Sequence, residues 1–109
     1  MPTYSLIIAV STYGYANEVM DAARKAGATG GTIINSRAIG GMEESRFMGI
    51  SLREEKEILI TLISNQIRDD ILKAISGYSA QHPDCEILTL SVPASNVVGI
   101  AAPMASTAP

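Results

Sequence analysis

Residues 57–63 read Glu-Ile-Leu-Ile-Thr-Leu-Ile, a stretch in which five of the seven side chains are aliphatic. Residues 6–10 read Leu-Ile-Ile-Ala-Val and are apolar throughout. Short apolar runs that are rich in β-branched residues are typical of strands covered on both faces. The two runs therefore predict two central strands of a sheet, which we place at residues 3–10 and 57–63.

Two other segments have the period of a helix. Residues 16–26 place apolar side chains at helical spacing, and Gly27 follows where a C-terminal cap glycine belongs. The second segment has an apolar face over residues 67–75, with a serine or asparagine cap at residues 64–65 and an end at Gly77. The sequence therefore predicts two amphipathic helices, each following an apolar strand.

Two further strand signals complete the order of elements. Residues 32–34 begin a second strand, whereas a loop over 78–84 leads into a fourth strand at 85–92 that Pro93 closes. A short extended piece at 97–100 can add an edge. The order β-α-β-β-α-β predicts a ferredoxin-like α+β fold, with two helices on one face of an antiparallel four-stranded sheet.

The composition is that of one folded domain. The chain has 109 residues, of which 47% are hydrophobic, and a formal net charge of −3. We expect a domain over residues 1–100 and a flexible tail over 101–109. The sequence lacks the basic stripe that nucleic-acid binding requires, so we expect no nucleic-acid partner. Cys85 is the lone cysteine, and the first ten residues contain neither a basic leader nor a membrane span. We therefore expect a cytoplasmic protein without membrane insertion.

The apolar strands leave one face of the predicted sheet without a cover. Two helices cover only one side, and the rest of the chain offers no further layer. An exposed apolar face promotes aggregation, whereas its burial against another copy is favourable by about 25 cal/mol per Å². We therefore expect a homo-oligomer whose subunits pack sheet against sheet, most simply a ring with clefts between neighbours.

A long polar connection joins the second and third strands. Residues 36–56 exceed what a hairpin needs, and long loops in compact domains are often functional. Three arginines lie in or beside this connection: Arg37, Arg46 and Arg53. Arginine suits phosphate or carboxylate, but four glutamates nearly balance the charge, which leaves open a solvated loop or a ligand lid. Phe47 and Met48 give the loop an apolar surface for a neighbour or a ligand.

Few residues of the sequence suit catalysis or metal binding. His82 is the only histidine, Cys85 is the only cysteine, and no pair of carboxylates has a spacing that indicates acid and base catalysis. One histidine per chain gives little support for a metal site. We therefore predict no catalytic residue, no metal ligand and no enzymatic activity.

Several segments resemble the PII signal-transduction (nitrogen regulatory) proteins. The family pattern AL…GxxGxTVxxVxGxG is similar to the first helix and to residues 27–34, Gly-Ala-Thr-Gly-Gly-Thr-Ile-Ile, with Gly40 following. Residues 57–63 and the helix after them resemble the family's third strand and second helix. Residues 87–100 resemble its fourth strand and the segment that follows. The resemblance covers nearly the whole predicted domain.

This resemblance implies a trimer of ferredoxin-like subunits that binds an adenine nucleotide (AMP, ADP or ATP) in the clefts between subunits. Four residues match family positions near the nucleotide: Gly30, Thr32, Gly40 and Leu62. The family's Gly-Asp-Gly-Lys phosphate-binding turn corresponds to residues 83–86, Pro-Asp-Cys-Glu, in which only Asp84 is retained. The resemblance therefore places Asp84 in the same ligand-binding cleft.

The resemblance also implies a loop that contacts a partner protein. The counterpart here is shortened to residues 39–54 and contains no tyrosine, which excludes the uridylylation known in the family. Arg46, Phe47 and Met48 are the residues in this loop that we expect to contact a partner, such as a regulated transporter or enzyme.

Three hypotheses for function follow. The leading one is a non-catalytic trimeric sensor that binds a small effector between subunits and signals through residues 39–54. A second is a metal-handling trimer similar to the CutA proteins, which depends on His82 and Cys85. A third is a structural interaction module that binds no nucleotide.

Overall fold

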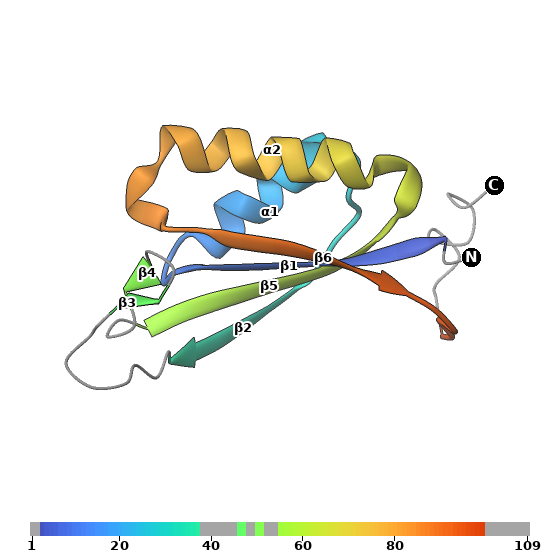
Figure 1. The fold of residues 1–109 in the computed structure, drawn as a ribbon, viewed down its shortest axis with the longest axis horizontal. Coiled ribbons are helices and arrows are strands. Elements are labelled where there is room, and N and C mark those ends of the chain that lie inside the picture. Colours follow the sequence, from blue (N-terminus) through green and yellow to red (C-terminus); the bar gives the residue numbers. More distant parts are fainter. Residues whose placement is uncertain (1–2, 38–45, 48–49, 52–54, 100–109) are drawn as a thin grey trace.

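The computed structural model describes residues 3–37, 46–47, 50–51 and 55–99. Two helices, α1 (Ala16–Lys25) and α2 (Arg68–Gln81), lie side by side on one face of a sheet (Figure 1). The sheet has four strands in the order β2 (Thr32–Arg37), β5 (Glu55–Ser64), β1 (Tyr4–Thr12) and β6 (Leu88–Ala94). Among the described residues, no helix has the length and apolar character needed to cross a membrane.

This arrangement confirms the predicted ferredoxin-like α+β fold. The central strands are β1 and β5, the two strands that the apolar runs predicted. Their antiparallel register is continuous from Tyr4 opposite Ser64 to Thr12 opposite Lys56. β5 extends beyond its predicted range at both ends, and β1 continues past its predicted end to Thr12, because the polar residues there continue the same pairing.

The core lies between the sheet and the helices. Along β1, buried side chains alternate with partly buried ones, and Ile7 and Ala9 face the helices. Their partners across β5, Thr61 and Leu59, are buried as well. The helices contribute the following buried side chains: Val19, Met20, Ala23, Ile71 and Ile75. The period of two in the strands and of 3.6 in the helices brings these side chains to one layer.

The start of α1 depends on a side chain of β5. Tyr15 occupies the N-cap position but forms no capping hydrogen bond through its side chain. Instead, Glu57 Oε1 accepts hydrogen bonds of 3.0 Å from the backbone N–H groups of Gly14 and Ala16. The carboxylate thus satisfies two donors at the positive end of the helix.

The second helix continues beyond its predicted end at Gly77, so this prediction is wrong. α2 runs to Gln81, and the predicted loop 78–84 instead holds the last helical turn and most of the 3₁₀ turn η2 (Pro83–Cys85). A glycine inside a helix costs about 1 kcal/mol relative to alanine. The packing of Tyr78 against the core accompanies this continuation and can outweigh that cost.

The last strand is also shifted from its prediction. It covers Leu88–Ala94 rather than 85–92, because Cys85 ends η2 and Glu86, its C-cap, has a left-handed backbone conformation. Pro93 lies inside the strand, where its missing N–H is tolerated because β6 is an edge strand with one unpaired side. The described residues 97–99 form no strand, so the predicted edge piece is wrong for them.

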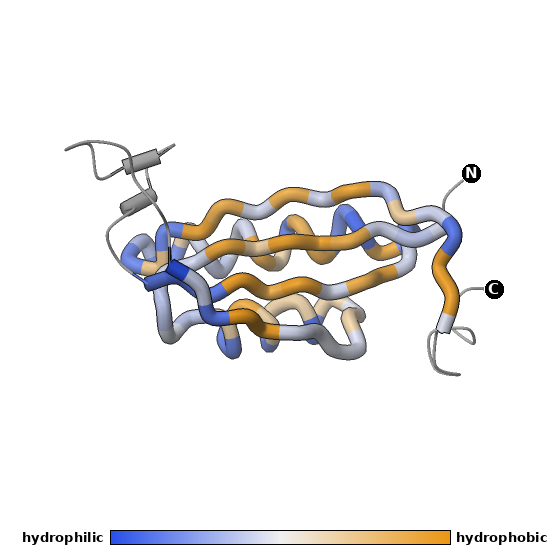
Figure 2. Tube along the Cα trace, turned by 90° about the horizontal axis from the view of Figure 1, so that it is seen from below, coloured by the Kyte–Doolittle hydropathy of each residue, from blue (hydrophilic) through white to orange (hydrophobic). Residues whose placement is uncertain are grey.

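The sheet face opposite the helices is apolar, as predicted. Figure 2 views the strands from this side and shows long hydrophobic stretches along them. The register forms cross-strand rows, of which two read Ile34, Ile58, Val10, Leu88 and Thr32, Ile60, Ile8, Leu90. Ile34, Leu90 and Val92 expose 43%, 41% and 41% of their surfaces. We refer to this surface as the open face.

Replacing Glu57 with alanine should destabilise the protein by about 1–2 kcal/mol, because the N–H groups of Gly14 and Ala16 lose their acceptor. Urea unfolding followed by circular dichroism, at one fixed protein concentration, measures this change. Glu57→Gln keeps an oxygen acceptor and should lose less. The exposed neighbour Glu55 provides the control, since Glu55→Ala should stay within about 0.5 kcal/mol of the wild type. Equal losses for the two alanine variants would contradict the capping role.

Candidate functional site

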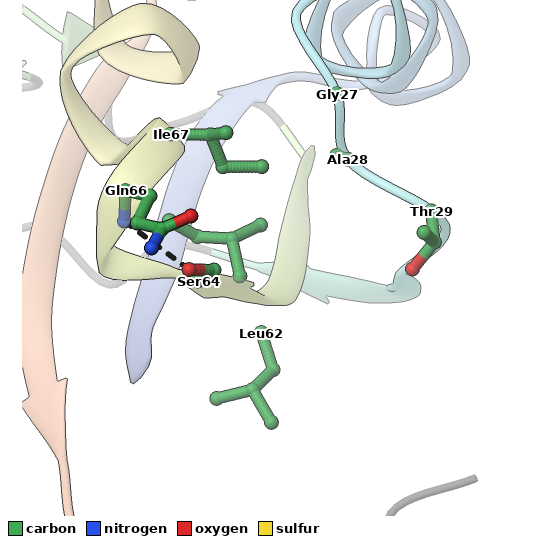
Figure 3. Close-up of a pocket in the computed structure, with 8 residues that line it drawn as sticks. Gly27, Ala28, Thr29, Leu62, Ser64, Gln66 and Ile67 are labelled. Carbon is green, nitrogen blue, oxygen red and sulfur yellow. Dashed lines mark hydrogen bonds between the residues drawn. The ribbon is translucent and has the colours of Figure 1, made fainter. Parts of the chain in front are cut away.

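A hollow lies at the end of the sheet where β5 leads into α2. Its volume is about 180 Å³, with residues 27–29 on one side and the end of β5 with the 3₁₀ turn η1 (Asn65–Ile67) on the other (Figure 3). The hollow is lined by Gly27, Ala28, Thr29, Leu62, Ile63, Ser64, Gln66 and Ile67. Ligand pockets commonly measure about 300–1,000 Å³, so this hollow is smaller than a typical ligand pocket.

One wall of the hollow is the turn that follows α1. Gly27 has a φ of +119°, in the left-handed region, which confirms the predicted cap glycine. Its N–H donates to the Arg24 carbonyl at 2.9 Å, and the N–H of Ala28 donates to the Ala23 carbonyl at 3.1 Å. Ala28 is buried in the core, whereas the next residue, Thr29, is exposed at the rim of the hollow.

The opposite wall is fixed to β1 by polar contacts. Ser64 Oγ accepts a hydrogen bond of 3.2 Å from the Gln66 N–H and caps η1. The predicted cap therefore acts on the 3₁₀ turn before the second helix, whereas α2 itself has Ile67 at its N-cap and no side-chain cap. The Asn65 N–H donates to the Thr3 carbonyl at 2.9 Å, and the Ser5 hydroxyl donates to Asn65 Oδ1. In Figure 3 the side chain of Leu62 points away from η1. Leu62 also belongs to the open face, so the hollow and the open face meet there.

Two glycines carry the chain from the hollow into β2. A Cβ atom on Gly31 would lie 2.8 Å from the Ile60 carbonyl oxygen and 3.1 Å from Met20 Sδ. A Cβ on Gly30 would have no atom within 4 Å, although the Gly30 carbonyl accepts a hydrogen bond from the Thr61 hydroxyl. The close packing of this segment therefore requires glycine at position 31 and not at position 30.

A buried ion pair lies near the other end of the sheet. Lys56 stands opposite Thr12 and Ser36 in the register and is 1% exposed. Its Nζ lies 3.8 Å from Glu86 Oε1 and, among the described residues, has no hydrogen-bond partner. Thr12 Oγ1 is likewise buried and without a hydrogen-bond partner in that part of the chain. Buried polar groups are usually satisfied, so these two atoms are exceptions in the described part of the chain.

The structure separates the predicted ligand-binding residues into two groups. Leu62 lines the hollow, and Gly30 and Thr32 lie on the segment that leaves it. Asp84 is exposed in η2, which leads toward β6 at the end of the sheet that holds Lys56. Lys56 and Leu62 are six residues apart on β5, which corresponds to about 20 Å. A small ligand cannot contact both groups within one chain.

Part of the predicted loop site lies outside the described residues. Gly40 and Met48 belong to this part, so their predicted roles stay predictions. Arg46 and Phe47 form β3 (Arg46–Phe47), which pairs with β4 (Ile50–Ser51) in a short antiparallel hairpin.

Several residues of these sites were not predicted from the sequence. Thr29 lies within the glycine motif that the sequence highlighted, and this motif was the only signal for it. Gln66 and Lys56 had none, because a polar residue beside an apolar strand is ordinarily exposed. Glu86 stands where the family motif has a lysine, and no sequence signal singled it out. Its contact with Lys56 is visible only in the structure.

The geometry around His82 and Cys85 gives no support to metal handling. Within the described part of the chain, no group of three or more His, Cys, Asp or Glu side chains could hold a metal. The His82 ring stacks on Tyr78 with the ring centroids 4.1 Å apart. Burial raises the pKa of the Cys85 thiol, which disfavours the thiolate that nucleophiles and metal ligands require.

The fold matches solved structures of PII-like signalling proteins. A putative PII-like signaling protein (TTHA0516) from Thermus thermophilus aligns with a TM-score of 0.59 at 16% identity, over 84% of this chain and 86% of that chain. CPII is a nitrogen regulatory PII-like protein from Thiomonas intermedia K12, solved bound to ADP, AMP and bicarbonate. It aligns with a TM-score of 0.57 at 13% identity, over 90% of this chain and 98% of that chain. A functionally unknown protein from Pediococcus pentosaceus ATCC 25745 aligns with a TM-score of 0.64 at 16% identity, over 92% of this chain and 100% of that chain.

These similarities concern the fold. No protein-family model matches the sequence, and no curated protein matches it either. At 13–16% identity over most of both chains, what is shared is the order and packing of the elements. The fold that the sequence resemblance implied is therefore confirmed.

Substituting Gly31 by alanine should destabilise the protein by about 1–3 kcal/mol, because the new Cβ would clash with backbone and core atoms. Gly30→Ala is the matched control, since its Cβ would meet open space, and should change stability by less than about 1 kcal/mol. Thermal unfolding of both variants measures the difference. Similar melting temperatures for the two variants would refute the close approach at Gly31.

Proposed function

We propose that this chain is a non-enzymatic PII-like regulatory protein that forms a homotrimer in the cytoplasm. In this proposal, an adenine nucleotide binds between subunits and the segment 39–54 reports its presence to a partner protein, such as a transporter or an enzyme. The observation that carries the proposal is the partial hollow at the border of the open face. The PII-like fold and a solved neighbour bound to ADP, AMP and bicarbonate support it.

Association through the open face follows from its apolar character. The helices bury the other face of the sheet, while aliphatic side chains of all four strands line this one. Apolar area is stabilised by about 25 cal/mol for each Å² removed from water. A second copy of the same surface is the simplest cover, and a closed ring covers every copy equally.

A position between copies also suits the ligand. The hollow beside Leu62 offers apolar surface and the Thr29 hydroxyl for a flat base, whereas the buried cation Lys56 lies about 20 Å away along β5. A nucleotide whose base and anionic groups use both features must therefore contact two copies. This geometry favours a cleft between subunits over a pocket within one chain.

Sedimentation of the wild-type protein should give about three times the 11.5 kDa mass of one chain. Leu90→Glu places a charge on the open face and should shift the protein toward single chains, since burying an unpaired charge is strongly unfavourable. The control Asn17→Glu, on the exposed side of α1, should leave the mass unchanged. A wild-type protein that sediments as one chain would remove the basis for shared clefts.

Calorimetric titration with AMP, ADP and ATP should detect binding to the wild-type protein. Thr29→Trp fills the hollow from its exposed rim and should weaken binding by about tenfold or more, because the base loses its position. Asn17→Trp adds the same side chain away from the hollow and should bind as the wild type does. Absence of binding by all three nucleotides at millimolar concentration would instead favour a structural interaction module.

A further inference from the structure

A second hollow lies between α2 and β6, the strand that runs below α2 in Figure 1. Its volume is about 300 Å³. Four residues of α2 and two at the start of β6 line it: Leu72, Ile75, Ser76, Ser79, Ile87 and Thr89. An apolar cavity of about 150 Å³ can hold benzene. This hollow therefore has room for at least one large side chain.

The outer side of β6 has no paired strand. In the described sheet β6 pairs only with β1, so the backbone N–H and C=O groups of alternate residues face away from the sheet. Proteins protect such edges with charged side chains, prolines or short strands. Residues 88–92 contain no charged side chain, and Pro93 protects only the last part of β6. Residues 88–92 therefore form an unprotected edge on which another strand can pair.

The hollow lies on the helix side of this edge. Thr89 stands opposite Ala9, which is buried against the helices, so the two side chains point to the same side of the sheet. Thr89 Oγ1 is buried and has no hydrogen-bond partner in the described part of the chain. Ile75 gives the hollow a buried apolar wall, whereas Ser76 is exposed where the hollow opens. An added strand would continue the pleat, so every second side chain would point toward α2 and the hollow.

We infer that β6 and α2 form a docking groove for an extended, uncharged segment of a partner protein, which pairs with residues 88–92 and places an apolar side chain in the hollow. In such strand addition, backbone hydrogen bonds give affinity and pockets for alternate side chains give specificity. The buried Thr89 hydroxyl offers the segment a further hydrogen bond. No charged residue lines the hollow, so a charged side chain would be buried there without a partner.

The groove is separate from the surfaces that the proposed function uses. None of the residues that line it lines the hollow beside Leu62. The proposed homotrimer forms through the open face, on the other side of the sheet, and leaves the helix side outward. A partner protein is therefore favoured over a second copy as the occupant. This choice of occupant rests on the proposed homotrimer, whereas the groove itself does not.

The test is fluorescence polarisation of the full chain with three labelled heptapeptides, in which valine, leucine or phenylalanine alternates with threonine. At least one peptide should bind saturably. Two forms of that peptide, each N-methylated on one of its two sets of alternate amides, provide the matched control. Only one set of amides can face β6, so one form should bind about tenfold or more weakly because it loses several hydrogen bonds. The other form should bind as the parent peptide does.

Ser76→Trp fills the hollow from its opening and should weaken peptide binding by about tenfold or more, because the apolar side chain loses its position. Ala80→Trp adds the same side chain at an exposed position of α2 outside the hollow and should bind as the wild type does. Both variants should sediment with the mass of the wild type.

Three results would overturn the inference: no saturable binding by any peptide, equal affinities for the two methylated forms, or wild-type affinity in Ser76→Trp. A smaller assembly in Ser76→Trp, with Ala80→Trp unchanged, would also overturn it, since a second copy would then occupy the groove. Peptide binding with the expected losses, by a wild-type protein that sediments as one chain, would support the groove and remove the proposed homotrimer.

Discussion

The need to cover both faces of β1 and β5 is the constraint on which the rest of this structure depends. These strands are central in the sheet and carry aliphatic side chains on each side. Two helices bury one side, because their apolar faces match the pleat of the strands. The other side needs a cover from outside the described elements. The homotrimer that we propose would provide this cover.

The functional features lie at the two ends of these central strands. At one end, the turn after α1 and the start of η1 leave a small hollow. At the other end, Lys56 is buried next to Glu86 and Thr12 without full hydrogen bonding in the described residues. The helices and the core hold both ends in place, because Gly31 packs tightly against Ile60 and Glu57 caps α1.

Local sequence signals were reliable where one strong physical preference acted alone. The apolar runs predicted both central strands, and Gly27 predicted the end of α1 through its backbone conformation. Ser64 caps the 3₁₀ turn that precedes α2. The signals failed where tertiary packing opposed them. Gly77 is a weak helix breaker, and α2 continues past it as Tyr78 packs against the core. Pro93 indicates a strand end, but an edge strand with an unpaired side tolerates it.

The sequence by itself determined the fold class, the two central strands and the apolar character of the open face, because hydrophobic period and turn chemistry are local properties. It also pointed to Leu62 and to the glycine motif. Only the tertiary structure decided that Gly31 rather than Gly30 requires glycine, and that Lys56 is buried beside Glu86. These facts depend on atoms brought together by strand register and by the η2 turn from residues about thirty positions apart. Local patterns carry no information on such contacts.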